Sequence, residues 1–230
     1  MNSSDKTITD IKAGKNARLQ RSNIYLNGKF AFSLDDEVVL KEKLQIGQPL
    51  SGALLEKLNG ADSYQRCLNA AFQFLTTRPR SQSEVRERLT RRGFGGTEIE
   101  QAVANLKRLN LLDDAAFAEY WKENRTAFRP RSQRMIKLEL RSKGVEAEVV
   151  NEAVSQIDET ANAYQAATTK AARLQAADYR EFSKKLGGFL QRRGFGYGVI
   201  KSTVKQVWLE KSGQSVSPVD LEEETGTAPD

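Results

Sequence analysis

Arg78-Pro79-Arg80-Ser81-Gln82 occurs twice in this chain, because the same five residue types return at Arg129-Pro130-Arg131-Ser132-Gln133, 51 residues later. Each copy opens a segment rich in arginine and lysine, and each segment closes on a cation followed by glycine, at Arg92-Gly93 and at Lys143-Gly144. A third such ending, Arg193-Gly194, follows 50 residues after the second. Self-similarity at a fixed period of this size indicates stacked supersecondary units.

Apolar residues repeat in register around the three glycines. Residues four and eight positions before each glycine lie on one helix face, and those six, ten and thirteen positions after it form a second stripe with a period near 3.6. These residues are Leu89, Val85, Leu140, Ile136, Leu190 and Leu186 before the glycines, and Ile99, Val103, Leu106, Val150, Val154, Ile157, Ile200, Val204 and Val207 after them. Glycine adopts positive φ without steric cost, so each one fits the turn between two helices.

A further segment with an apolar stripe precedes each of these helix pairs, at 64–76, 114–127 and 158–174. The sequence therefore predicts a mainly α fold, an elongated array of three tandem three-helix, helix-turn-helix-like repeats with a small N-terminal α+β appendage. The expected boundaries are 1–59 for the appendage, 62–112, 113–157 and 158–211 for the repeats, and 212–230 for a disordered acidic tail.

The first 59 residues follow a different pattern. Short strand-like runs at 18–26 and 29–34 flank Asn27-Gly28, which supplies the two positive φ values of a type I′ hairpin turn. Asp35 and Ser51 are placed to cap two short helices, the second of which is expected to end at Leu58. We expect residues 59–62 to form a linker, and the appendage, which is too small for a large core of its own, to dock on the first repeat.

Helix punctuation explains part of the repeated stretch. Pro79 ends the preceding helix, and Ser81 with Glu84 forms the capping-box pattern Ser-x-x-Glu. Thr97 with Glu100 is expected to form a second capping box. The flanking arginines are not explained in this way, since a cation near a helix N-terminus opposes the macrodipole at a cost of about 0.3 kcal/mol or more. Their presence in both copies indicates a role other than stability.

Positive charge is concentrated in three segments of the chain. The net charge is +6, whereas residues 78–93, 129–144 and 179–194 carry +4, +5 and +4, so the remainder carries −7. Three basic helices in register on a repeating scaffold form a stripe that can follow a polyanion. The candidate residues for binding DNA or a protein–DNA filament are Arg78, Arg80, Arg86, Arg91, Arg92, Arg129, Arg131, Arg134, Lys137, Arg141, Lys143, Lys184, Lys185, Arg192 and Arg193.

Composition argues against several classes of protein. Histidine is absent and Cys67 is the only cysteine, so the commonest general base, the usual zinc ligands and any intramolecular disulfide are missing. We predict no catalytic residue, no metal and no cofactor. Cys67 lies on an apolar helix stripe, which favours a small core residue over a reactive thiol. No membrane-length apolar run and no secretory leader is present, so we expect a cytoplasmic protein.

Several short motifs occur in a characteristic order along the chain. They are Arg80-Ser81 leading to Leu89 and Gly93, then Leu109-Asn110-Leu111-Leu112-Asp113-Asp114 with Phe117 and Ala118, then Leu140 to Gly144. In this order they resemble the RecX family of regulatory proteins, which modulate the bacterial recombinase RecA. Residues 24–32 are similar to a β-rich extension that some members carry. The resemblance implies a non-enzymatic protein in the groove of the RecA–DNA filament that limits strand exchange, ATP hydrolysis and coprotease activity.

Two other functions are less well supported by the sequence. A stand-alone helix-turn-helix protein could bind duplex DNA, although no heptad pattern for a dimer is visible and three unequal repeats do not suit a palindromic site. An enzyme such as a nuclease would need a carboxylate cluster or a histidine, and the sequence shows neither. The expected partners are the RecA filament and, weakly and without sequence preference, single- and double-stranded DNA, bound by a monomer. If about five phosphates are neutralised, log K should fall against log salt with a slope of roughly −3.5 to −4.5.

Overall fold

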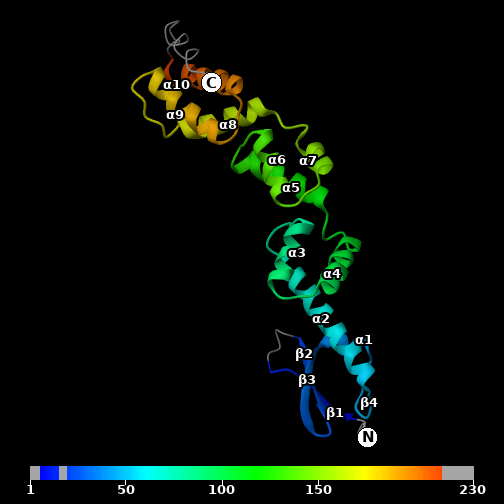
Figure 1. Cartoon of the computed structure of the whole chain (residues 1–230). Coiled ribbons are helices and arrows are strands. Elements are labelled where there is room, and N and C mark those ends of the chain that lie inside the picture. The colour runs from blue at the N-terminus through cyan, green and yellow to red at the C-terminus, as the bar shows by residue number, and fades with distance from the viewer. Residues whose placement is uncertain (1–5, 16–19, 214–230) are drawn as a thin grey trace. The chain divides into compact units, whose positions relative to one another are not determined.

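The computed structural model describes residues 6–15 and 20–213, so the predicted acidic tail lies outside the described residues from position 214 onward (Figure 1). The chain divides into two compact units, Met1–Leu112 and Asp113–Asp230. The described residues are mainly α-helical, with a small N-terminal sheet, as the repeat pattern predicted. No helix in the described part of the chain is long and apolar enough to cross a membrane.

The N-terminal unit begins with a four-stranded sheet in the order β3-β2-β1-β4. Its strands are β1 (Lys6–Ala13), β2 (Arg21–Leu26), β3 (Lys29–Asp35) and β4 (Pro49–Leu50), and the pairings β1–β2, β2–β3 and β1–β4 are antiparallel. Asn27 and Gly28 connect β2 to β3 with φ values of 50° and 78°. These values confirm the predicted type I′ turn.

Helix α1 (Asp36–Lys41) follows β3 directly. The Asp35 carboxylate accepts a hydrogen bond from the Glu37 N–H at 3.1 Å, which confirms the predicted N-cap. Strand β4 was not anticipated, because a two-residue edge strand that begins with proline has no periodic signal.

Helix α2 (Gly52–Leu75) belongs to both the sheet domain and the first repeat. Ser51 caps it, as predicted, through a hydrogen bond from the Leu54 N–H to its Oγ at 3.1 Å. Near the start of the helix, Leu58 is buried in the core of the sheet domain, and later in the same helix Leu68 is buried in the core of the first repeat. The linker predicted at 59–62 is therefore wrong, because burial on both sides of these positions keeps the helix continuous.

A buried carboxylate on α2 fixes the sheet to this helix. The Asp62 Oδ1 accepts a hydrogen bond from the Asp35 N–H at 2.7 Å and lies 3.2 Å from the Arg21 Nη1. The Asn69 amide on the same helix donates to the Asp35 Oδ2 at 2.8 Å. The appendage therefore docks on the helix that opens the first repeat, as expected.

The first repeat is completed by α3 (Gln82–Arg91) and α4 (Gly96–Arg108). Ser81 and Glu84 form the predicted capping box at the start of α3. The second predicted box is wrong, because α4 begins at Gly96 with Gly95 as N-cap, which places Thr97 inside the first turn.

The C-terminal unit contains the other two repeats. The second repeat consists of α5 (Asp114–Phe128), α6 (Gln133–Ser142) and α7 (Ala147–Val154), and the third of α8 (Glu159–Ala171), α9 (Tyr179–Arg192) and α10 (Tyr197–Ser212). Each repeat has its own cluster of buried apolar side chains. A chain of small cores explains how 230 residues with 39% hydrophobic content fold stably.

The three glycines close the basic helices with the same geometry. Gly93, Gly144 and Gly194 have φ values of 84°, 72° and 87°, in the left-handed region. In each turn the residue after the glycine donates its N–H to the carbonyl of a buried leucine five positions earlier: Phe94 to Leu89 at 3.3 Å, Val145 to Leu140 at 3.2 Å, and Phe195 to Leu190 at 3.3 Å. The predicted repeat unit, helix–glycine turn–helix, is confirmed.

The second copy of the repeated stretch contacts the third glycine turn. The backbone N–H of buried Ser132 donates to the carbonyl of Arg193 at 3.1 Å. A Cβ at Gly194 would lie 2.6 Å from the Ser132 Oγ and would overlap Met135. Serine therefore caps α6 and also supplies one side of the contact between the second and third repeats.

Candidate nucleic-acid interface

The arginines of the first repeated stretch are held by their own chain. The Arg78 guanidinium makes two hydrogen bonds to the Glu84 carboxylate, at 2.8 and 3.1 Å, and a third to the Pro79 carbonyl at 2.8 Å. The Arg80 guanidinium lies over the Phe74 ring, 4.0 Å from its centroid. These contacts give both arginines a structural role that the sequence analysis did not foresee.

The second copy uses a different partner. Arg131 forms an ion pair with Glu139, whose other carboxylate oxygen accepts from the Arg125 Nε at 2.6 Å and from the Trp121 indole N–H at 2.7 Å. The Glu139 side chain is only 15% exposed, so this carboxylate is a half-buried centre of charge on the basic helix α6. Arg129, at the C-cap of α5, is exposed.

Two further candidates lie over aromatic rings. The Lys143 ammonium lies 4.5 Å from the Trp121 centroid. The Arg193 guanidinium lies 4.5 Å from the Phe189 centroid and donates to the Pro130 carbonyl at 2.7 Å. Such cation–π contacts stabilise the fold and hold the side chain in place.

Three candidates form exposed ion pairs. Their partners are Glu100 for Arg86 at 2.8 Å, Glu87 for Arg91 at 2.5 Å, and Glu181 for Lys185 at 2.6 Å. The hydrogen bond from Arg86 lowers the pKa of Glu100, and the one from Lys185 lowers the pKa of Glu181. Exposed pairs of this kind contribute about 0–1 kcal/mol to stability and reduce the net field of each cation.

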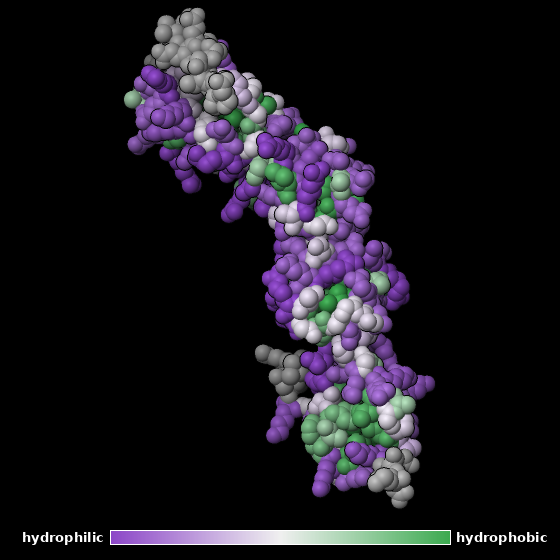
Figure 2. Space-filling view, viewed as in Figure 1, coloured by the Kyte–Doolittle hydropathy of each residue, from purple (hydrophilic) through white to green (hydrophobic). Residues whose placement is uncertain are grey.

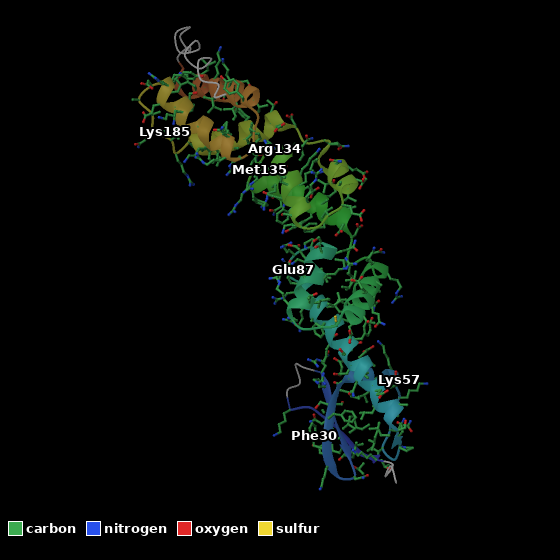
Figure 3. All side chains as sticks on the ribbon, viewed as in Figure 1. Phe30, Lys57, Glu87, Arg134, Met135 and Lys185 are labelled. Atoms are coloured by element: carbon green, nitrogen blue, oxygen red, sulfur yellow. The ribbon has the colours of Figure 1, made fainter. Side chains whose placement is uncertain are left out.

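The remaining candidates project from the surface. Within the described residues, Arg134, Lys137 and Arg141 on α6 have no ion-pair partner, and their spacing of three and four places them on one face of the helix. Figure 3 labels Arg134 on α6. Hereafter we call these three residues the α6 stripe. The other exposed candidates without an ion-pair partner among the described residues are Arg92 in the first repeat, Arg129 in the second, and Lys184 and Arg192 in the third.

The α6 stripe is complete only in the second repeat. Counting from the glycines, its three positions hold Ser83, Arg86 and Thr90 in the first repeat and Lys184, Gly187 and Gln191 in the third. The partner position also changes: where Glu100 neutralises Arg86, the second repeat has Asn151. One substitution therefore removes the carboxylate that would neutralise Lys137.

A groove of about 350 Å³ runs along this face of α6. The stripe and the exposed Leu138 line it on one side, and Glu159 at the start of α8 lines it on the other. Hydrophilic side chains cover most of the face of these helices seen in Figure 2. Three long cationic side chains line this groove. Such a surface suits a phosphate backbone, which is bound through its charge, whereas base edges are read by hydrogen bonds in the grooves of the nucleic acid.

Among the described residues, no three carboxylate or thiol side chains come together as a metal site would require. Cys67 is fully buried, and burial raises the pKa of its thiol to about 11. The prediction that Cys67 is a core residue is confirmed, since a thiol with this pKa stays protonated at neutral pH.

The three-helix repeats and the glycine turns that join their helices define a helical-repeat protein. Four domain descriptions of one known protein family match this chain. The descriptions "Regulatory protein RecX N-terminal domain", "RecX, first three-helix domain", "RecX, second three-helix domain" and "RecX, third three-helix domain" match residues 6–51, 67–106, 113–154 and 157–204. The chain belongs to the RecX family of regulatory proteins.

Relatives agree along most of the chain. A regulatory protein RecX of Clostridium botulinum (strain Alaska E43 / Type E3) is 29% identical over 204 residues, which cover 86% of this chain and 95% of that protein. One of Bacillus pumilus (strain SAFR-032) is 28% identical over 204 residues, covering 87% and 77%. A crystal structure of regulatory protein RecX matches with a TM-score of 0.66 at 23% identity, over 86% of this chain and 98% of that one. RecX from Lactobacillus salivarius matches with a TM-score of 0.55 at 24% identity, over 65% and 99%.

Proposed function

We propose that this protein is a non-enzymatic regulator that binds the RecA–DNA filament in the cytoplasm and lowers its recombinase, ATPase and coprotease activities. The observation that carries the proposal is the α6 stripe, three cations on one helix face that have no ion-pair partner among the described residues, whereas the one equivalent cation of the first repeat, Arg86, is paired with Glu100. Membership of the RecX family supports the choice of RecA as partner.

The proposed contact is electrostatic and follows the DNA backbone. Arg134, Lys137 and Arg141 lie on successive turns of one helix face, so they can reach several phosphates on one strand. Charge pairing within the protein leaves the other basic positions, such as Arg78 and Arg131, with weaker external fields. The α6 stripe is therefore the principal polyanion contact, and the exposed Arg92, Lys184 and Arg192 are secondary contacts.

The test is the ATPase rate of RecA on single-stranded DNA with the protein added below stoichiometry. The proposal predicts a fall in rate and a shorter filament. An unchanged rate together with an unchanged filament length would refute it.

A stand-alone helix-turn-helix protein remains the alternative, because an exposed basic second helix is also the element that such proteins place in the major groove. Protection of a particular short duplex, at an affinity that survives competition by unrelated duplexes, would favour this alternative. The proposed regulator binds both duplexes equally in the absence of RecA.

A further inference from the structure

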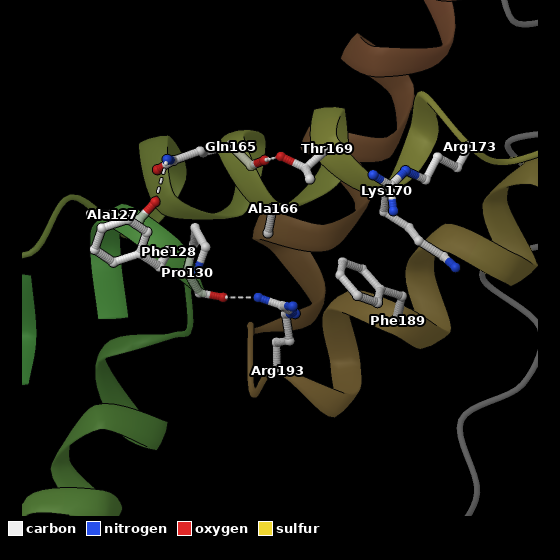
Figure 4. A pocket seen from close by; sticks show the side chains of 10 residues that line it. All are labelled: Ala127, Phe128, Pro130, Gln165, Ala166, Thr169, Lys170, Arg173, Phe189 and Arg193. Atoms are coloured by element: carbon white, nitrogen blue, oxygen red, sulfur yellow. Dashed lines mark hydrogen bonds between the residues drawn. The ribbon is translucent and has the colours of Figure 1, made fainter. Parts of the chain in front are cut away.

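A second basic site lies within the C-terminal unit, away from the α6 stripe. It is a pocket of about 260 Å³ between the end of α5 and the helices α8 and α9 (Figure 4). Its principal lining residues are Phe128, Pro130, Lys170, Arg173, Phe189 and Arg193. The lining, all of it within the described residues, contains three cations and no carboxylate.

The cations of this pocket have unused donors. Arg193 donates one hydrogen bond, to the Pro130 carbonyl, and the other N–H groups of its guanidinium have no acceptor among the described residues. Burial lowers the pKa of Arg193, and the nearby Arg131 and Arg129 lower it further. Burial and the positive charges of Arg131 and Arg129 both disfavour the charged guanidinium of Arg193, so a bound anion would be stabilised here.

Lys170 and Arg173 lie at the C-terminal end of α8. The helix dipole is stabilised by a cation at this end, which could by itself explain their presence. That role is already filled by Lys211, whose ammonium donates to the carbonyls of Ala171 and Leu174, both at 2.7 Å. Lys170 and Arg173 are both exposed and have no ion-pair partner among the described residues. Their charge is therefore available to a ligand.

An exposed aromatic ring stands beside these cations. The Phe128 side chain is 78% exposed, more than any other large apolar side chain in the described part of the chain. Phe189 forms the inner wall, with the Lys170 ammonium 5.8 Å and the Arg193 guanidinium 4.5 Å from its centroid. Phe128 contributes little to the core, and in this pocket it lies with a second ring, Phe189, and three cations, which is what distinguishes it from other exposed apolar side chains.

We propose that this pocket binds one nucleotide of single-stranded DNA, with the base against Phe128 and the flanking phosphates at Lys170 and Arg173. Aromatic faces beside a basic track are the usual composition of single-strand sites, because every base has a face to stack and every base lies between two phosphates. A duplex keeps its bases stacked inside the helix, so it cannot present an unstacked base to Phe128. This inference rests on the proposed function and adds a second point at which single-stranded DNA contacts the protein.

The test uses the full chain and a fluorescently labelled oligothymidylate of about 15 nucleotides, with binding followed by anisotropy. Phe128→Ala should weaken binding about fivefold or more, while an abasic oligomer of the same length binds Phe128→Ala and the wild type equally. Phe30→Ala, which removes another exposed ring at 59%, is the matched control and should leave binding unchanged. Equal effects of the two substitutions, or equal loss with the abasic oligomer, would overturn the stacking contact.

The phosphate contacts are tested by the double variant Lys170→Gln, Arg173→Gln against Lys201→Gln, Lys205→Gln, which removes the same charge from α10. The first pair should reduce the salt slope by about 1.4, as expected for two single-strand phosphates, and the second by much less. Equal reductions would contradict the site.

The RecA ATPase separates this inference from the proposed function. A pocket variant that keeps its oligonucleotide affinity but loses its effect on RecA would assign the pocket to an acidic segment of a protein partner, and the nucleotide assignment would fail. Loss of oligonucleotide affinity by the pocket variants, with no effect of the wild type on RecA, would support the pocket and refute the proposed function.

Discussion

The backbone N–H of Ser132 donates to the carbonyl of Arg193 at 3.1 Å, across the contact between the second and third repeats. The side chain of Arg193 returns a hydrogen bond to the Pro130 carbonyl at 2.7 Å. The three residues from Pro130 to Ser132, which join α5 to α6, are thus tied to one glycine turn by two hydrogen bonds donated in opposite directions. In its second copy the repeated stretch therefore serves as a docking site as well as a helix start.

Gly194 should be the least replaceable glycine in the C-terminal unit. Gly194→Ala combines a positive φ of 87° with overlap on Met135 and should lower the free energy of unfolding by about 2–4 kcal/mol. Gly213→Ala, at φ 64° with nothing within 4 Å, should cost about 1 kcal/mol. Urea unfolding followed by tryptophan fluorescence reports on this unit, since both tryptophans, Trp121 and Trp208, lie in it. Equal costs would contradict the tight contact.

Glu139 should contribute more to stability than other carboxylates on the surface of this repeat. Glu139→Gln leaves Arg125 and Arg131 without their half-buried counter-charge and should cost about 2–3 kcal/mol in urea unfolding followed by circular dichroism. Glu119→Gln, which removes a carboxylate that is 49% exposed from its ion pair with Lys122, should cost less than about 1 kcal/mol. A small effect at Glu139 would return Arg131 to the group of binding candidates.

Gly60 tests the continuity of α2. It is exposed in the middle of this helix with nothing within 4 Å of a Cβ, so Gly60→Ala should raise the free energy of unfolding by about 0.5–1 kcal/mol. Gly93→Ala, in the same unit but at φ 84°, should lower it. No gain at Gly60 would indicate that the predicted linker, and not a helix, is present in solution.

The buried Cys67 thiol should make the free energy of unfolding depend on pH in the alkaline range. Its folded pKa of about 11, raised first by burial and then by Glu98, lies above the value of about 8.5 expected in the unfolded chain. The folded state therefore keeps the thiol proton longer, and this contribution is full below about pH 8.5 and falls as pH rises toward 11. The stability difference between wild type and Cys67→Ala should change by about 2 kcal/mol in favour of the variant between pH 7 and pH 10. A constant difference would contradict the burial.

The fold could be predicted because its signals are local and repeated. The glycines, the capping serines and the apolar stripes each act within one or two helical turns, so a period of about 50 residues makes the unit visible. The continuity of α2 could not be predicted in this way, since Gly60 favours a break and only burial of Leu58 and Asp62 by distant residues opposes it.

The candidate site was only partly predictable. The α6 stripe has a helical spacing that is visible in the sequence, but a count of charge treats every cation alike. Which cations are neutralised depends on tertiary contacts, such as Arg86 with Glu100 from the next helix. The role of Phe128 also depends on its exposure, which its place in an apolar-striped helix concealed.

The most direct measurement of the central claim compares two triple variants that remove the same charge. In the first, Arg134, Lys137 and Arg141 are replaced by glutamine. In the second, the ion-paired Arg86, Arg91 and Lys185 are replaced by glutamine. The account predicts that the first variant loses most of the effect on RecA ATPase and flattens the salt slope of DNA binding by roughly 2–3, while the second retains both. Equal effects of the two variants would show that net charge, and not the α6 stripe, determines binding.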